Sequence, residues 1–503
     1  MANYKRKLFS GYSNWSTYQL GDRRAPWKLL LPISSNAPIL AIGLKGDNLE
    51  SLARSWKMVH EYECSDREFE WAKRQAQSLG HNCSFTSLTS LTPARSTYHA
   101  VAISAEFEGV CSPIMALGLL EPGGSLARVR GRDNILYASG QAFKGFESVR
   151  TYTLLPTNSG EILLPLSNGK LTRAGLNLYM PGRWQSRLAV RVGKVASGLG
   201  FQRLLATRQV FVARKPGRLD EGQYLLDKLG VHIGCPITDA TVYAGWKNFT
   251  LLLLDNRGLV IGVAKVADTK LGAASLNREM NILRRLAIIP EIQGFVPKIL
   301  GSGDFDGYSF SIQSDIHSAG TGYATKLTSE HLRFLTALSR IDRCEMTLNQ
   351  WPRWSEIRRW AYEWEFISVK EAEAVRTAIE RCALKLDNAR IPFHRFHGDF
   401  SPWNVLPGSN GLGVVDWEDS EAMGLPLFDA VHFAIRVMTS LRKKALSLAQ
   451  PSCVSRLALG IDGELNSLVS SLSLTGSHGM TSDQIEALIA LCIIVAAKER
   501  RLL

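Results

Sequence analysis

The segment HGDFSPWNV, which begins at His397, constrains this chain more than any other, because it sets an acid and an amide at a fixed spacing. Asp399 and Asn404 form the pattern D-x-x-x-x-N, and a second acid, Asp416, follows twelve residues after Asn404 within VVDWE. The apolar residues before Asp416 predict a short buried strand that ends at this acid. The two segments therefore predict one compact site with two carboxylates and an amide.

These three side chains are of the types that phosphoryl transfer requires. One carboxylate must lie beside the acceptor hydroxyl and take its proton, and a second must hold magnesium against the β- and γ-phosphates. Asp399 can fill the first role and Asp416 the second, while Asn404 can complete the metal shell. The catalytic residues are thus predicted to be Asp399 and Asn404, and the metal ligands Asn404 and Asp416. The alternative is a surface loop in which the acids occur by chance.

The order of these motifs resembles the aminoglycoside phosphotransferase and choline kinase branch of the protein-kinase-like fold. HGD stands where kinases have HRD, and DWE stands where they have DFG. Gly424, Pro426 and Asp429 match the G-x-P-x-x-D segment that follows the metal-binding acid in that branch. The resemblance implies a bilobal kinase-like phosphotransferase domain, expected at residues 216–440, with ATP and Mg²⁺ as cofactors and an alcohol group as the acceptor.

The same resemblance implies a nucleotide site upstream of the catalytic loop. Lys265 stands on the apolar strand VAKVA, at the position of the kinase lysine that contacts the α- and β-phosphates. A lysine inside an apolar strand needs a partner, and Glu279 on the following helix is the expected one, the alternative being an ordinary surface glutamate. The turn GWKN could cover phosphates, and adenine would contact the lobe-connecting backbone. The predicted cofactor-binding residues are Lys265, Glu279, Gly245, Asn248, Gln313, Ser314, Asp315 and Ile316.

The N-terminal half has a different pattern. From Ala37 the chain alternates apolar strands with helical stretches, which predicts βαβ units and a mostly parallel sheet. This order resembles a class I S-adenosylmethionine-dependent methyltransferase domain, expected at residues 37–177. Glu63 follows the second strand, where that family binds the ribose, and LLEPGG at residues 119–124 stands in place of its L-x-P-G-G turn.

The first turn of this half departs from the methyltransferase pattern. The family has closely spaced glycines there, because the backbone must approach the ligand. Here Leu44 and Lys45 separate Gly43 from Gly46. Gly43 and Glu63 remain the candidate cofactor-binding residues, but binding of S-adenosylmethionine is doubtful. A retained Rossmann-like scaffold that no longer methylates is the preferred interpretation.

Residues 178–215 contain eight basic residues and no acid, and predict a basic linker helix. Its apolar residues recur at helical spacing: Trp184, Leu188, Val192, Val195 and Leu199. Such a helix can lie on an anionic membrane surface through residues 183–208. It can equally be an interdomain helix with solvated charges, and this interpretation is preferred.

The net charge and the cysteine content of the whole chain limit its partners and its compartment. The net charge of +13 favours anionic partners, but no zinc-finger spacing supports nucleic-acid binding. Eight scattered cysteines without a C-x-x-C pair favour a reducing compartment, which predicts a cytoplasmic protein, with peripheral membrane contact left open. The apolar run at residues 487–497 is too short to span a bilayer.

The predicted fold class is therefore α/β plus α+β, with a Rossmann-like methyltransferase-type domain followed by a bilobal kinase-like domain. Residues 1–36 are expected to form an N-terminal extension, and residues 441–503 to form C-terminal helices. The predicted function is ATP-dependent phosphoryl transfer to a hydroxyl group of a small molecule or glycan, in surface polysaccharide or secondary metabolite biosynthesis. Two alternatives remain open: a non-catalytic scaffold that binds nucleotides or glycans, and a bifunctional kinase-methyltransferase.

Overall fold

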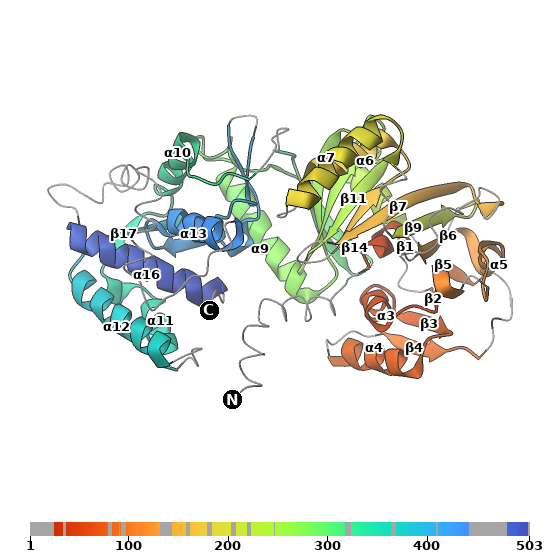
Figure 1. Ribbon diagram of the computed structural model, residues 1–503, viewed down its shortest axis with the longest axis horizontal. Helices are drawn as coiled ribbons and strands as arrows, with labels where there is room; N and C mark the ends of the chain where they lie inside the picture. Colours follow the sequence, from red (N-terminus) through yellow and green to blue (C-terminus); the bar gives the residue numbers. More distant parts are fainter. Residues whose placement is uncertain are drawn as a thin grey trace. The chain divides into compact units, whose positions relative to one another are not determined.

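The chain divides into two compact units (Figure 1). The first comprises the described residues up to Asn277 together with Ile299–Asp315, and the second comprises Arg278–Lys298 and the described residues from Ile316 onward. The computed structural model describes residues 25–33, 37–78, 83–89, 91, 97–107, 109–130, 143–156, 161–178, 184–202, 208–218, 223–245, 247–316, 323–363, 369–408, 411–441 and 480–500.

A mixed sheet runs through the first unit in the order β14-β15-β13-β12-β11-β8-β7-β9-β6-β5-β2-β3-β4. Its parallel strands are β2 (Ile39–Ile42), β3 (Met58–Tyr62), β4 (Ser84–Ser87), β5 (Tyr98–Ser104) and β6 (Leu120–Arg130). The helices that connect them are α3 (Gly46–Ala53), α4 (Asp66–Ser78) and α5 (Pro113–Leu119). The βαβ alternation predicted from Ala37 is present, and central strand β2 is buried along its whole length, as parallel strands usually are.

The sheet continues antiparallel beyond β6, through β9 (Gln209–Arg214), β7 (Ser148–Pro156) and β8 (Glu161–Pro165). Strand β11 (Asp239–Ala244) then pairs with β8 through Val242 and Leu163. The remaining strands are β12 (Phe249–Leu254), β13 (Val260–Ala267), β15 (Tyr308–Gln313) and β14 (Ile299–Phe305). The methyltransferase-like strands and the strands expected for the first kinase lobe therefore belong to one sheet, which the sequence did not indicate.

The start of the described chain is part of the core of this unit. The 3-10 helix η1 (Pro26–Leu30) packs against β8, β9 and β11, and Trp27 is buried. Lys28 Nζ donates to the Ser51 carbonyl oxygen at 2.7 Å and to Asp268 Oδ2 at 2.9 Å, and both charged side chains are at most 1% exposed. Because a buried charge needs a partner, this pair ties η1 to the residue that follows β13. Two-residue strands β1 (Pro32–Ile33) and β10 (Gln223–Tyr224) pair beside it, before α8 (Leu225–Ile233).

Only part of the segment at residues 178–215 is helical. Helix α7 (Trp184–Gly198) packs on α6 (Gly169–Leu178), whereas residues 209–214 form strand β9 between β6 and β7. The sequence QVFVAR suits a buried strand because β-branched and aromatic residues pack well on a pleated surface. The side chains of Trp184 and Arg187 lie outside the described part of the chain.

The second unit is mainly helical. Its helices are the end of α9 (Lys270–Leu286), then α10 (Ser329–Leu338), α11 (Trp354–Glu363), α12 (Val369–Leu386), α13 (Phe428–Arg436) and α16 (Ser482–Arg500). Its strands are β16 (Cys344–Met346), β17 (Ile391–Phe396), β20 (Glu421–Gly424) and the hairpin of β18 (Val405–Leu406) and β19 (Gly413–Val414). Helix α16 packs against α12 and α13, which buries the apolar run at residues 487–497. None of the described helices has the length and apolar character needed to cross a membrane.

The predicted fold class is confirmed as a mixed α/β architecture: a parallel, Rossmann-like set of strands and connecting helices precedes antiparallel strands and a mainly helical unit. The sequence suggested a linker helix between the methyltransferase-like part and the kinase-like part. Their strands instead belong to one sheet, in which β8 pairs with β11.

Candidate active site

The catalytic loop leaves the buried strand β17 and is held by His397. The N–H of Asp399 donates to His397 Nδ1 at 3.2 Å, and Nε2 on the other side of the ring contacts the Val415 carbonyl oxygen at 3.0 Å. Since Nδ1 accepts, the pattern assigns the proton to Nε2. The fully buried imidazole therefore ties the loop to the backbone just before Asp416.

Asp429, at the start of α13, fixes the first two residues of the loop. Its Oδ2 accepts from the N–H of His397 at 2.7 Å and its Oδ1 from the N–H of Gly398 at 3.1 Å. Gly398 has φ of 86°, and a Cβ there would lie 2.3 Å from the Asp419 carbonyl oxygen, so the turn needs glycine. The buried carboxylate of Asp429 therefore accepts two backbone hydrogen bonds and holds the segment that carries Asp399.

The carboxylate of Asp399 has its own contacts. Ser401 Oγ donates a short hydrogen bond to Asp399 Oδ1, and Nε2 of the buried His432 lies 3.7 Å from the same oxygen. Asn404 Nδ2 donates to the Asp399 carbonyl oxygen at 2.9 Å, so the structure brings the two predicted catalytic residues together. Ser401 and His432 were not predicted as site residues. The available signal for His432 was a polar residue among the buried apolar side chains of the helix FDAVHFAIR.

Asp416 follows β19 in an unusual backbone conformation. Its φ of 70° and ψ of 62° are left-handed, which is uncommon outside glycine and tends to occur at functional sites. The N–H of Val415 donates to the Asn404 carbonyl oxygen at 2.9 Å, so the two predicted metal ligands lie on connected backbone. On the other side of Asp416, the N–H of Trp417 donates to Oε1 of Glu279 at 3.2 Å.

Asn404 and Asp416 supply oxygen ligands of the kind that Mg²⁺ prefers. In the described part of the chain, no cluster of three or more His, Cys, Asp or Glu side chains is arranged to hold a metal ion. A site with few protein ligands still fits magnesium, which usually binds through one or two carboxylates together with substrate phosphates and water. The donor set of this loop is therefore compatible with the predicted metal.

The remaining predicted nucleotide residues lie in separate segments. Lys265 is half-buried on β13, between Thr250 of β12 and Ser311 of β15. Glu279 is 1% exposed on α9. The pairing of Lys265 with Glu279 stays a prediction.

The turn at residues 245–248 is closed by a bond from the N–H of Gly245 to the Asn248 carbonyl oxygen at 3.1 Å. A Cβ on Gly272 would lie 2.7 Å from the Lys247 carbonyl oxygen, so this turn lies against the start of α9. In the expected adenine-contacting segment, Gln313 ends β15 and is buried, Ser314 and Ile316 are half-buried, and Asp315 is exposed. The division between the compact units falls between Asp315 and Ile316.

The first turn of the methyltransferase-like part is covered by a ring. Gly43 has φ of 60°, and a Cβ there would lie 1.9 Å from the ring of Phe107, which therefore lies directly against the turn. Leu44 is buried in the core. Glu63 is exposed with φ of 58°, while the nearby Glu61 is buried and accepts from the N–H of Cys64 at 3.1 Å. These residues do not fit S-adenosylmethionine, whose amino-acid end rests on a bare glycine turn in this family.

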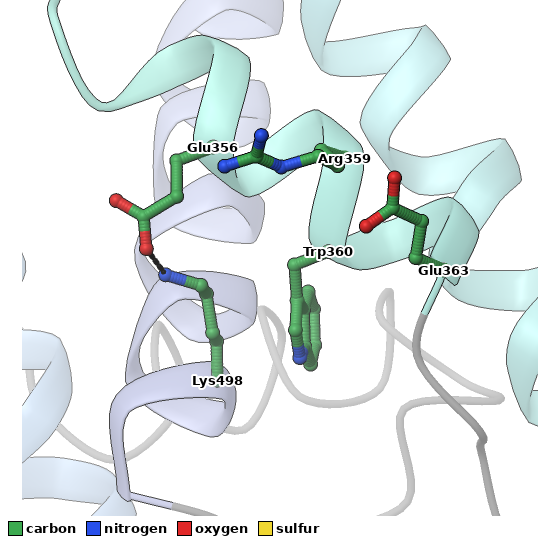
Figure 2. A pocket seen from close by; sticks show the side chains of 5 residues that line it. All are labelled: Glu356, Arg359, Trp360, Glu363 and Lys498. Carbon is green, nitrogen blue, oxygen red and sulfur yellow. Dashed lines mark hydrogen bonds and ion pairs between the residues drawn. The ribbon is translucent and has the colours of Figure 1, made fainter.

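A pocket of about 350 Å³ lies between α11 and the end of α16 (Figure 2). It is lined by Glu356, Arg359, Trp360, Glu363 and Lys498. Lys498 Nζ donates to Glu356 Oε1, and this hydrogen bond lowers the pKa of Glu356. Trp364, which the sequence pairs with Trp360 at helical spacing, lies outside the described residues.

The ordered motifs are matched by a known family. The model of the phosphotransferase enzyme family matches residues 242–447. The predicted resemblance of the C-terminal half to aminoglycoside phosphotransferases is thereby confirmed, and this part of the chain is similar to the phosphotransferase enzyme family. No curated protein matches the chain.

Solved structures similar to the chain include aminoglycoside phosphotransferases and methyltransferases. The ADP-bound aminoglycoside phosphotransferase APH(2'')-Ib is 19% identical, with a TM-score of 0.32, and covers 54% of this chain and 97% of its own. The gentamicin complex of APH(2'')-IIa is 19% identical, with a TM-score of 0.31, and covers 52% of this chain and 99% of its own. A predicted O-methyltransferase from Agrobacterium tumefaciens is 16% identical, with a TM-score of 0.24, and covers 39% of this chain and 82% of its own.

Proposed function

We propose that this chain is an ATP-dependent phosphotransferase whose acceptor is a hydroxyl group of a small molecule or glycan. The observation that carries the proposal is the way Asp399 is held: Asp429 and His397 fix its backbone, and Ser401 donates to its carboxylate. Phosphoryl transfer depends on positioning more than on covalent chemistry. A carboxylate on so constrained a loop is suited to that task.

Each residue has a stated role in this proposal. Asp399 orients the acceptor hydroxyl and takes its proton as the hydroxyl oxygen attacks the γ-phosphorus of ATP, whose bond to the bridging oxygen breaks to release ADP. Asn404 and Asp416 hold Mg²⁺, which when bound neutralises charge on the phosphates. Lys265 binds the α- and β-phosphates, as the kinase resemblance implies.

The open surface pocket beside α11 has side chains that could contact a hydroxyl-bearing ring. Trp360 presents an aromatic ring, and Glu356 and Glu363 can accept hydrogen bonds from hydroxyl groups (Figure 2). Its volume of about 350 Å³ lies within the range of small-molecule sites. If it recognises the acceptor, Trp360→Ala should raise the KM for the acceptor and leave the KM for ATP unchanged.

The decisive experiment is turnover of Mg-ATP by the full chain across acceptor classes. Aminoglycosides, free sugars and lipid-linked glycans would be compared by acceptor-dependent ADP release and by the mass of the product. Asp399→Asn should abolish transfer while calorimetry still shows nucleotide binding, because this acid acts on the acceptor. Absence of acceptor-dependent ADP release across the panel would favour the scaffold alternative, and equal turnover in Asp399→Asn would rule out the assigned role.

For the first unit, we propose that S-adenosylmethionine binds weakly or not at all. The ring of Phe107 lies against Gly43, and Glu63 is exposed. One charged hydrogen bond from Glu63 is worth only about 1.5–3 kcal/mol and cannot replace the lost glycine turn. Titration of S-adenosylmethionine into the full chain tests this prediction. The Phe107→Ala variant is titrated in parallel. Micromolar binding by the unmodified chain, together with methyl transfer to a phosphorylated glycan, would instead make it a bifunctional enzyme.

A further inference from the structure

Helix α7 buries one face and exposes apolar side chains on the opposite face. Val190, Gly193 and Ser197 are buried, and Val190 packs with Leu164 and Leu176. This face is sufficient to attach α7 to α6, beside which it lies in Figure 1. A surface helix attached in this way normally carries polar residues on its other side.

The other side of α7 instead exposes a stripe of large apolar side chains. Leu188 is 54% exposed, Val192 58%, Val195 63% and Leu199 67%. At about 100° per residue, these four positions lie within about 60° of one another and roughly opposite the buried face. Phe201, just after the helix, is also 57% exposed. Exposed apolar residues that are single need no explanation, but a contiguous row marks a surface that contacts something.

The charges beside this stripe are positive. Arg191 and Lys194 lie on α7 and Arg173 lies on the adjacent helix α6. Burial, followed by the charges of Arg173 and Arg191, lowers the pKa of Lys194, so the three side chains form one electrostatic group. Residues 178–215 contain no acid that could neutralise it.

We propose that α7 docks on the surface of an anionic phospholipid bilayer. The apolar stripe would enter the boundary between headgroups and acyl chains, while the flanking basic side chains meet the lipid phosphates. The complementarity of charge selects this occupant over a neutral apolar partner. Docking would hold the chain at a membrane surface without a spanning helix.

The test is cosedimentation of the full chain with two kinds of vesicle: phosphatidylcholine alone, and a two-to-one mixture of phosphatidylcholine and phosphatidylserine. We expect binding to the mixed vesicles that weakens with added salt. Val192→Ser with Val195→Ser should lower the partition coefficient at least tenfold. Arg191→Gln with Lys194→Gln should lower it about fivefold per charge removed.

A matched control replaces two exposed apolar residues outside the stripe, Ile114→Ser with Val231→Ser, and should leave vesicle binding unchanged. Unfolding midpoints of all variants verify that each is folded. The proposal is overturned if the unmodified chain does not bind mixed vesicles, or if the stripe variant binds as well as the control. It is also overturned if the chain forms a dimer that the stripe variant dissociates while vesicle binding is absent, because the stripe would then be an interface between copies.

Discussion

Replacement of Asp429 by asparagine tests whether the catalytic loop depends on this carboxylate. The asparagine side chain is isosteric, but its amide oxygen can accept only one of the two backbone N–H groups, while its NH₂ group faces the other donor. A hydrogen bond to a charged group is worth about 1.5–3 kcal/mol. If the loop conformation that presents Asp399 is destabilised by that free energy, kcat falls about 10- to 150-fold. The KM for Mg-ATP should change little, because Asp429 bonds to the backbone that leads to Asp399, the residue proposed to act on the acceptor.

The assay is steady-state ADP release by the full chain, once an acceptor is known, with unfolding midpoints to verify folding. Asp483→Asn is the matched control, since Asp483 pairs with Lys385 on the surface, and such pairs contribute at most about 1 kcal/mol. Gly398→Ala gives an independent perturbation of the same loop and should also lower kcat. An unchanged kcat in both folded loop variants would refute the reasoning.

Three further outcomes are expected. Asp416→Ala should abolish magnesium-dependent nucleotide binding. Equal Mg-ATP affinity of the variant and the unmodified chain, measured by calorimetry, would contradict the metal assignment. Lys28→Ala should lower the free energy of unfolding by about 3–5 kcal/mol, because it leaves the Asp268 carboxylate buried without this lysine. The double variant Lys28→Met with Asp268→Leu should recover most of that loss, which denaturant unfolding measures. Burial lowers the pKa of His331 and of His394 to about 4. Protonation therefore favours the unfolded chain, and the unfolding midpoint should fall as pH drops from about 6.5 toward 4, whereas a flat profile would contradict it.

The part of the site that the sequence predicts is the part that is contiguous in the chain. Asp399 and Asn404 stand on one loop, so their spacing alone brings them together, and the structure joins them through a hydrogen bond from the Asn404 side chain to the Asp399 carbonyl oxygen. Asp416 follows a short apolar strand, as the pattern VVDWE indicates. The family match at residues 242–447 spans all three positions.

The contacts that hold those residues could not be predicted in the same way. Ser401 and His432 contact one oxygen of Asp399, but His432 belongs to a helix whose place depends on tertiary packing. Glu279 was expected beside Lys265, a pairing that stays a prediction, but its contact with the N–H of Trp417, which is distant in sequence, was not predicted. Strand β9 was hidden for another reason: its six residues lie within a basic stretch whose composition suggests a linker.

The pairing of β8 with β11 has a practical consequence for dissecting this chain. A fragment that begins after residue 215 lacks β8, so β11 would become an unpaired edge strand. A fragment that ends at residue 215 lacks β11, so β8 would become an unpaired edge strand. Unpaired strand edges can recruit other chains and aggregate. Neither half is therefore expected to behave well when expressed alone. Inactivation of one half by point substitution in the intact chain is the better way to separate their activities.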